Sequence, residues 1–189
     1  MLQKQNNHNP ELRKIAVIGP ESTGKSTLCA QLAEHYNTIW VPEYAREFLH
    51  ENGPSYTFDD LLTIASRQLV LEDKLAQQAT NNLLFIDTEM YVMKVWCEFV
   101  FGKTHQWILD QAAMRHYDLF LLCNIDLPWI KDEFREYPEM EPRIKLFNIY
   151  KDNMINQHVP WKVISGTENE RFHEAVGAID NILARAAHA

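Results

Sequence analysis

Gly19-Pro-Glu-Ser-Thr-Gly24-Lys25-Ser26 is the stretch that decides the fold of this chain. It fits the pattern G-x-x-x-x-G-K-[ST], in which glycines let backbone N–H groups turn toward phosphate oxygens, the lysine meets the β and γ phosphates, and the hydroxyl can bind Mg²⁺. The stretch lies between the β-branched apolar run 13–18 and the helical pattern 25–36, as a strand–loop–helix unit requires. It therefore predicts a site for ATP and Mg²⁺. The candidate ATP contacts are Gly19, Glu21, Ser22, Thr23, Gly24, Lys25, Ser26 and Thr27.

Apolar runs and helical patterns alternate along the rest of the chain. The apolar runs that predict further strands lie at 38–41, 83–86, 118–123 and 161–165. The patterns that predict further helices lie at 43–50, 57–79, 88–101, 104–115 and 168–186. This alternation predicts an α/β fold of the P-loop NTPase type, with a five-stranded, mostly parallel sheet and helices on both faces.

The length and net charge of the chain limit the domain organisation and the partners that we expect. A chain of 189 residues predicts a single domain, 1–189, in which we expect 1–12 to be flexible. Its 18 basic and 26 acidic residues give a net charge of −8, which argues against nucleic acid or an anionic membrane as partner. We expect a cytoplasmic protein, because the N-terminus carries no apolar signal segment and no apolar run is long enough for a bilayer.

The cysteines and histidines do not predict a metal centre. Cys29, Cys97 and Cys123 are odd in number, widely spaced and set among apolar neighbours, which favours reduced core thiols over disulfides or zinc ligands. The eight histidines show no metal-binding spacing.

A carboxylate follows the apolar run 83–86 directly. Asp87 is placed to hold Mg²⁺ beside Ser26, although it could instead cap the next helix. The guanine-reading motif of GTPases is missing, because Cys123-Asn124-Ile125-Asp126 lacks its lysine, and the Ser-Gly-Gly signature of ABC ATPases is absent. A small-molecule kinase or an ATP-driven binding module remains.

Two further segments favour a kinase. Val41-Pro-Glu43-Tyr44-Ala-Arg46 brings a carboxylate and a guanidinium to the edge of the sheet where an acceptor would lie, unless it is only the exposed start of a helix. The segment 127–143 carries Lys131, Arg135 and Arg143, and we interpret it as an arginine-bearing lid, with a solvated charged loop as the alternative. Aromatic residues after Asp87 can stack on an acceptor ring or belong to the core: they are Tyr91, Trp96, Phe99 and Trp107.

Four segments together resemble a known family. They are the phosphate loop through Thr27, Pro-Glu-Tyr-Ala-Arg at 42–46, Asp87-Thr88, and Asp126-Leu-Pro-Trp-Ile-Lys-Asp-Glu-Phe-Arg135. They resemble the nicotinamide riboside kinase domain of bacterial NadR-like proteins, over about 14–178. That resemblance implies phosphorylation of the 5′-hydroxyl of nicotinamide riboside to nicotinamide mononucleotide in NAD biosynthesis.

The resemblance also implies roles for single residues. Gly24 to Thr27 would contact phosphate and Mg²⁺, Asp87 would lie on the metal side, Arg135 would be a lid arginine that contacts ATP, and Thr167 would lie near the adenine. Glu43 would fall where related kinases place a general base. NadR proteins also carry an adenylyltransferase domain, and this chain has no His-x-Gly-His-type motif, so the second step to NAD is not expected.

The sequence leaves several alternatives open. Either Glu43 or Asp87 can be the base that takes the hydroxyl proton, and the acceptor can be another nucleoside. A deoxynucleoside or nucleoside monophosphate kinase is the nearer rival, and a regulatory ATP-binding module without kinase activity is the rival of another class. The oligomeric state, homo-oligomer included, is not predicted. The candidates for acceptor contact are Glu43, Tyr44, Arg46, Asp87, Tyr91 and Trp96.

Overall fold

The computed structural model describes residues 12–187 and contains one five-stranded sheet. The strand order is β2-β3-β1-β4-β5, and every neighbouring pair is parallel. The strands are β1 (Arg13–Ile18), β2 (Ile39–Val41), β3 (Leu83–Asp87), β4 (Leu119–Cys123) and β5 (Trp161–Ile164). The predicted α/β fold is confirmed, and the sheet is wholly parallel. The expectation of flexibility for 1–12 falls, except at Leu12, outside the described residues.

Seven helices connect or follow the strands within the described residues. They are α1 (Lys25–His35), α2 (Tyr44–Asn52), α3 (Phe58–Ala76), α4 (Met90–Phe101), α5 (Gln106–Met114), α6 (Met140–Ile155) and α7 (Glu168–Ala187). Six of them match predicted helical patterns. Helix α6 is not among the predicted helices, because the tract before 161–165 is charged and contains prolines. Pro142 lies in the first turn of α6, where a missing N–H breaks no helical hydrogen bond.

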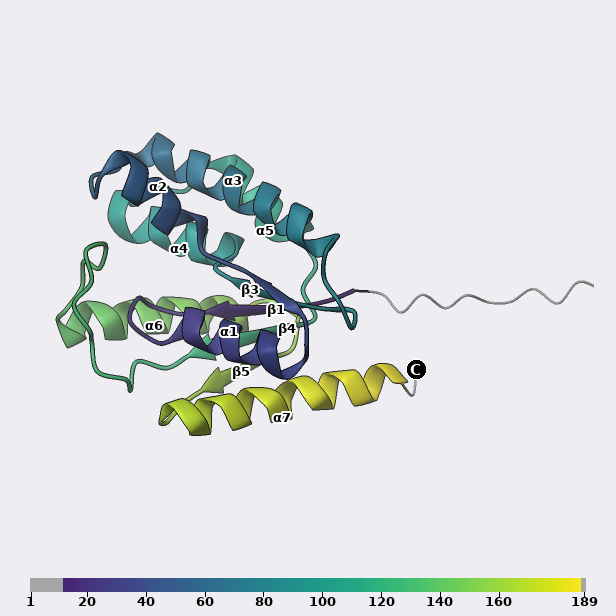
Figure 1. Cartoon of the computed structure of the whole chain (residues 1–189). Coiled ribbons are helices and arrows are strands. Elements are labelled where there is room, and N and C mark those ends of the chain that lie inside the picture. The colour runs from purple at the N-terminus through teal and green to yellow at the C-terminus, as the bar shows by residue number, and fades with distance from the viewer. Residues whose placement is uncertain (1–11, 188–189) are drawn as a thin grey trace, which may run out of the picture.

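The helices pack on both faces of the sheet (Figure 1). Successive residues of β1 point to opposite faces, so Ile15 and Val17 join one core cluster, with residues of α1 and α7, and Ala16 and Ile18 join another, with residues of α4 and α6. A third cluster lies among α2, α3, α4 and α5. Cys29, Cys97 and Cys123 are buried free thiols within these clusters or the strands.

The central place of β1 puts the phosphate loop in the middle of one sheet edge. Val17 pairs with Asp87 of β3, and Ile18 pairs with Leu122 of β4. The chain therefore leaves β1 between the carboxyl ends of two neighbours, at a point where crossover connections run to either side. Ligands of open α/β sheets bind at this kind of position.

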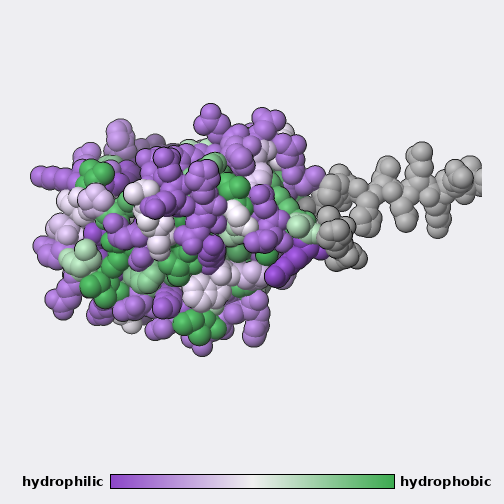
Figure 2. All heavy atoms as spheres, turned by 90° about the horizontal axis from the view of Figure 1, so that it is seen from below, coloured by the Kyte–Doolittle hydropathy of each residue, from purple (hydrophilic) through white to green (hydrophobic). Residues whose placement is uncertain are grey.

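The surface of the molecule is mixed. On the face shown in Figure 2, hydrophilic residues dominate and apolar residues form smaller islands between them. Among the described residues, no helix combines the length and the apolar character needed to cross a membrane.

Candidate active site

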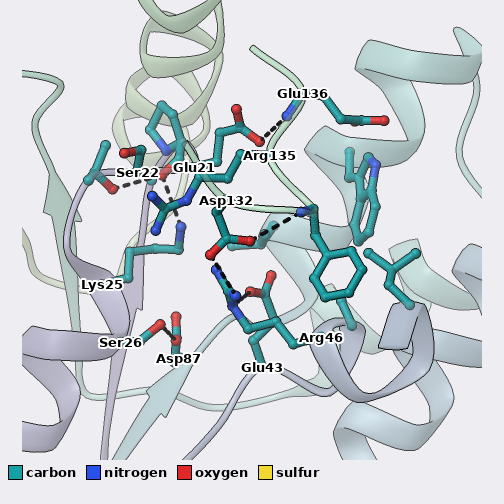
Figure 3. A pocket seen from close by; sticks show the side chains of 18 of the residues that line it. Glu21, Ser22, Lys25, Ser26, Glu43, Arg46, Asp87, Asp132, Arg135 and Glu136 are labelled. Carbon is teal, nitrogen blue, oxygen red and sulfur yellow. Dashed lines mark hydrogen bonds and ion pairs between the residues drawn. The ribbon is translucent and has the colours of Figure 1, made fainter. Parts of the chain in front are cut away.

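A cavity of about 660 Å³ opens at the carboxyl edge of the sheet. The phosphate loop lines one side, the start of α2 and one side of α4 line another, and the lid segment 127–143 contributes 132–137 (Figure 3). The candidate residues that line it are Gly19, Glu21, Ser22, Thr23, Gly24, Lys25, Ser26, Thr27, Glu43, Arg46, Asp87, Trp96 and Arg135. Most of the residues singled out from the sequence therefore meet in one space.

The two glycines of the phosphate loop meet separate geometric demands. Gly19 has φ +136°, and a Cβ there would lie 2.8 Å from the carbonyl oxygen of Cys123. Gly24 has φ +78° and is the N-cap of α1, a left-handed conformation that glycine adopts without steric penalty. The loop can thus pass close to β4 and turn directly into the helix whose N-terminus faces the cavity.

Contacts within the molecule hold the loop in this shape. The Lys25 ammonium donates to the carbonyl of Pro20 over 2.9 Å, and the Thr23 hydroxyl donates to the same carbonyl over 2.7 Å. The buried guanidinium of Arg171, on α7, donates to the carbonyl of Thr23 over 3.0 Å and pairs with Asp126. The loop is therefore held by its own side chains and by the first turn of the C-terminal helix α7.

Asp87 ends β3 beside Ser26. The Ser26 hydroxyl donates to Asp87 Oδ2 over 2.5 Å, whereas Oδ1 is buried and has no hydrogen-bond partner among the described residues. Burial, followed by the charge of Glu43, raises the pKa of Asp87 from 3.8 to about 6, against the opposing charge of Lys25. A buried carboxylate oxygen without a partner is unfavourable, and a bound cation would remove that penalty.

These two residues fit a magnesium ion. Mg²⁺ prefers oxygen ligands and usually takes one or two from the protein, with phosphates and water as the others. The Ser26 hydroxyl and the unpartnered Asp87 Oδ1 are oxygens of that kind. Within residues 12–187 no group of three or more His, Cys, Asp and Glu side chains is arranged for a metal ion. Phosphate oxygens would therefore have to complete the coordination.

A strained turn connects Asp87 with Glu43. Thr88 has φ +76°, and a β-branched residue in that region is strained by about 1–3 kcal/mol. The turn brings the Thr88 hydroxyl to Glu43, where it donates to Oε1 over 3.3 Å. The carboxylate of Glu43 also lies 3.8 Å from the guanidinium of Arg46. Glu43 is thus oriented from two sides while its side chain stays 22% exposed to the cavity.

The three basic residues of the lid take different positions. Arg135 faces the cavity and donates to the carbonyl of Ile130 over 2.5 Å. Lys131 is exposed. Arg143 is buried at the start of α6 and donates to the carbonyl of Leu127, so it supports the base of the lid. On the opposite side, Asp132 binds Arg46 over 3.2 Å, which brings the lid across the cavity to α2.

One end of the cavity is aromatic. Trp96 donates its indole N–H to the hydroxyl of Tyr56, which donates in turn to Glu136, each over 2.9 Å. Phe134 and Tyr137 line the same space. Sequence reasoning singled out Trp96 and also Phe99, which lines the same cavity, but it did not single out Tyr56, Phe134 and Glu136. These three lie in irregular segments without periodicity, so only tertiary structure brings them together.

Four candidates lie away from this cavity, and one of them, Trp107, is exposed on α5. Tyr44 packs against the cluster of α2 to α5, and Tyr91 packs edge-on against Phe120 at 5.7 Å. Tyr91 and Trp96 are five residues apart on α4, so their side chains diverge by about 140° around the helix axis. The hydroxyl of Thr167 binds Glu170 at the start of α7.

A second cavity, of about 270 Å³, lies on the other side of the phosphate loop. Its lining includes Gln31 of α1, Leu127, and Glu168 and Arg171, which follow Thr167 along the chain. Arg135 lines both cavities. The two spaces therefore meet at the phosphate loop and beneath one lid side chain.

A parallel sheet with a central strand–phosphate loop–helix unit and a buried carboxylate on the adjacent strand defines a P-loop nucleotide-binding protein. The chain belongs to the AAA domain family, whose model matches residues 14–171.

Curated relatives share most of this chain. It is 29% identical over 179 residues to the trifunctional NAD biosynthesis/regulator protein NadR of Salmonella typhimurium and 28% identical to that of Escherichia coli. Each alignment covers 91% of this chain and 43% of the relative. The chain thus spans less than half the length of these curated relatives.

Solved structures share the fold. A NadR protein in complex with NR has a TM-score of 0.75 at 22% identity, over 90% of this chain and 50% of that one. Thymidylate kinase from Ehrlichia chaffeensis has a TM-score of 0.65 at 16% identity, over 90% of this chain and 100% of that one. Deoxyadenosine kinase from M. mycoides has a TM-score of 0.57 at 13% identity, over 89% and 99% of the two chains.

Proposed function

We propose that this protein is an ATP-dependent kinase that phosphorylates the 5′-hydroxyl of nicotinamide riboside. The observation that carries the proposal is that one cavity joins the phosphate loop to an aromatic end lined by Tyr56 and Trp96. A kinase needs this arrangement, because the acceptor hydroxyl and the γ-phosphate must be held in line within one space. The NadR relatives, described as NAD biosynthesis proteins and represented by a structure with NR, support the acceptor.

Residues of the phosphate loop and the lid would bind the phosphates of ATP. In the proposed reaction Lys25 and the amides at the N-terminus of α1 bind the β and γ phosphates of ATP. The bond from the γ-phosphorus to the β–γ bridging oxygen then breaks, ADP leaves, and the acceptor oxygen bonds to the γ-phosphorus as it gives up its proton. Negative charge spreads over the other oxygens of the phosphoryl group, and Arg135 meets that charge from the lid. Mg²⁺, held by Ser26 and Asp87, supplies further neutralisation of phosphate charge when bound.

We assign the general base to Glu43. Asp87 is engaged by Ser26 and is suited to the metal side, whereas Glu43 keeps an exposed edge toward the acceptor end of the cavity. The Glu43→Gln variant should lower kcat by about 100-fold, the scale of a lost general base, while Glu34→Gln, an exposed site on α1, serves as control. Full turnover by Glu43→Gln would assign the base to Asp87.

The acceptor end also has a charge preference. Three cations line the main cavity: Lys25, Arg46 and Arg135. Seven carboxylates line it: Glu21, Glu43, Glu47, Asp87, Asp132, Glu133 and Glu136. Nicotinamide riboside carries a positive charge on its ring, and an aromatic ring such as Trp96 attracts a cation over its face. The excess of carboxylates supports a cationic nucleoside and disfavours a nucleoside monophosphate.

The fold neighbours supply the second candidate. Thymidylate kinase and deoxyadenosine kinase share the fold along nearly their whole length, so a deoxynucleoside or nucleoside monophosphate kinase is the alternative. A regulatory ATP-binding module without kinase activity is the candidate of another class. Acceptor-stimulated ADP release separates these candidates from one another.

The test measures ADP production from Mg-ATP with single acceptors. Nicotinamide riboside, thymidine, adenosine, cytidine and nucleoside monophosphates are offered one at a time, and products are identified by mass spectrometry. Selective formation of nicotinamide mononucleotide is the expected result. Stimulation by another acceptor would support a kinase with a different substrate. No stimulation by any acceptor would favour the regulatory module.

Further assignments go with this proposal. We assign the second cavity to the adenosine part of ATP, close to Thr167, and we assign 127–143 to a lid that closes over the γ-phosphate. The whole chain is proposed as one catalytic domain that ends its reaction at the mononucleotide. A cytoplasmic location remains a prediction, and so does the independence from nucleic acid and membrane.

A further inference from the structure

The carboxylate of Glu21 belongs to the phosphate loop, yet its hydrogen bonds go to the lid. Oε1 accepts from the backbone N–H of Tyr137 over 2.6 Å and from the indole N–H of Trp129 over 3.2 Å. Oε2 accepts from the backbone N–H of Glu136 over 2.9 Å. One carboxylate therefore binds three donors that come from both anchored stretches of the lid, and Figure 3 shows the contact with Glu136. Hydrogen bonds to an ionised acceptor are the stronger kind.

Two further contacts fix the same stretch. The Ser22 hydroxyl accepts a hydrogen bond from the backbone N–H of Ile130 over 2.9 Å. At the base of the lid, the buried Arg143 donates to the carbonyl of Leu127, and the charge of Glu21 opposes the effect of burial on the pKa of Arg143. The anchors at 129–130 and 136–137 leave 131–135 as a short bridge that carries Arg135.

We propose that Glu21 is a positioning residue that holds both ends of the lid on the phosphate loop, so that Arg135 reaches the transferred phosphoryl group. This rests on the proposed kinase function. Because Glu21 lies between Gly19 and Gly24, any shift of the loop on binding phosphate moves the lid anchors with it. The loop and the lid arginine then act as one unit.

This arrangement explains why a carboxylate is tolerated in an anion-binding loop. A free carboxylate beside ATP would repel phosphate, and the repulsion is stronger away from bulk water because the dielectric is lower there. Here three N–H donors surround the Glu21 oxygens and draw them toward the lid. The backbone amides and Lys25 of the loop stay available for phosphate.

The first experiment measures lid anchoring without any substrate. Lys131 and Arg135 are trypsin sites in the bridge between the anchors, so their cleavage rate reports local opening of the lid. Glu21→Gln should speed cleavage after both residues by about 10-fold, with circular dichroism unchanged. Glu34→Gln, the same chemical change on exposed α1, should match the wild type. Equal rates for Glu21→Gln and the wild type would overturn the anchoring.

The second experiment uses kinetics to separate positioning from general destabilisation. Glu21→Gln should lower kcat by about 10- to 100-fold, as expected for a misplaced catalytic group, with the KM for ATP within about 3-fold of the wild type. Arg135→Ala should show a similar loss. If Glu21 acts through Arg135, the double variant loses no more than Arg135→Ala alone. Additive losses would overturn the proposal.

The two arms keep this inference distinct from the proposed function. A wild-type chain that leaves nicotinamide riboside unchanged overturns that substrate, and the kinetic arm is then run with whichever acceptor stimulates ADP release. The proteolysis arm needs neither ATP nor acceptor. It therefore decides the role of Glu21 in holding the lid whatever the substrate is.

Discussion

Two fully buried carboxylates lie at opposite ends of the same sheet, and they differ in how many of their oxygens have hydrogen-bond partners. Glu72, on α3 near the amino ends of β1 and β4, accepts from Lys14 over 2.8 Å and from Tyr117 over 2.9 Å, with Arg115 at 3.5 Å. Asp87, at the carboxyl end of β3, is bound by Ser26 on one oxygen and has no partner on the other. Both residues have a relative exposure of 0%.

The difference separates a structural end of the sheet from a functional one. At the amino end both oxygens of Glu72 have partners, so the group ties α3 to β1 and to the segment that precedes β4. At the carboxyl end, within the described residues, one oxygen of Asp87 lacks a partner, Thr88 is strained, and Lys25 is bound only to a backbone carbonyl. Features of this kind weaken a fold and are commonly found at functional sites. Substitutions at the two ends should therefore affect different quantities.

The largest expected effect is on activity, at Lys25. Lys25→Met should lower kcat/KM by about 1,000-fold, near 4 kcal/mol, because a charge aimed at the transferring phosphate is lost. The free energy of unfolding should change by less than about 0.5 kcal/mol, as for a surface substitution. Initial rates and urea unfolding measure the two quantities, and a near-normal rate would refute the phosphate-loop mechanism.

The next effect is on stability, at Glu72. Glu72→Gln should lower the free energy of unfolding by about 3 kcal/mol, because Lys14 loses its buried countercharge and Arg115, among the described ion pairs, keeps only the exposed Asp73. Chemical denaturation measures this, and kcat of the folded enzyme should stay at the wild-type value. Asp73→Asn, at the exposed neighbour that also pairs with Arg115, is the matched control and should cost less than about 1 kcal/mol. Equal losses at the two sites would contradict the comparison.

Asp87→Asn should do the opposite of Glu72→Gln. We expect kcat/KM to fall by about 100-fold, while the variant unfolds at a higher urea concentration than the wild type at pH 7. The folded pKa of Asp87 is raised from 3.8 to about 6, so the folded state binds the proton more tightly than the unfolded state.

The pH dependence of that gain follows from the sign of the shift. The wild-type protein loses stability at this site as pH rises from about 4 to about 6, and the loss is complete above the folded pKa. The advantage of Asp87→Asn should grow through that window and then stay constant. A gain that shrinks with rising pH would contradict the assignment of an unpaired buried charge.

The smallest effect is expected at a site that belongs to neither end. Thr57 caps α3, where its hydroxyl accepts from the N–H of Asp60 over 3.3 Å and the Asp60 carboxylate accepts from the N–H of Thr57 over 2.7 Å. Thr57→Ala should lower the free energy of unfolding by about 1 kcal/mol, with kcat unchanged. Thermal unfolding measures the loss, and Thr57→Ser, which keeps the hydroxyl, should restore most of it.

The sequence predicted those elements whose local residue pattern matches the environment that they have in the folded protein. The runs at 15–18 and 83–86 are apolar on both faces because the sheet buries both faces, and the capping box at Thr57 is a local signal. Helix α6 was not predicted because its sequence, with Pro142 and many charged residues, shows no apolar periodicity that would distinguish a helix from a loop. Its apolar contacts, through Leu146 and Tyr150, become evident only against the sheet.

The sequence predicted only part of the candidate site, because some of its contacts depend on tertiary packing. The phosphate loop and Asp87 are tied to strand ends, and strand ends meet at one edge whatever the details of packing. The position of Tyr91 depends on which side of α4 faces Phe120, and the partners of Glu21 depend on a loop more than 100 residues away. Neither is encoded in spacing along the chain.

The two cavities that meet beneath Arg135 have a consequence for inhibitor chemistry. A molecule that joins adenosine to a nucleoside through a short oligophosphate would occupy both spaces and cross the phosphate loop between them. Linking the halves makes the second contact intramolecular, so affinity rises through effective concentration without new contacts. The best linker length would then serve as a ruler for the distance between the two bound substrates.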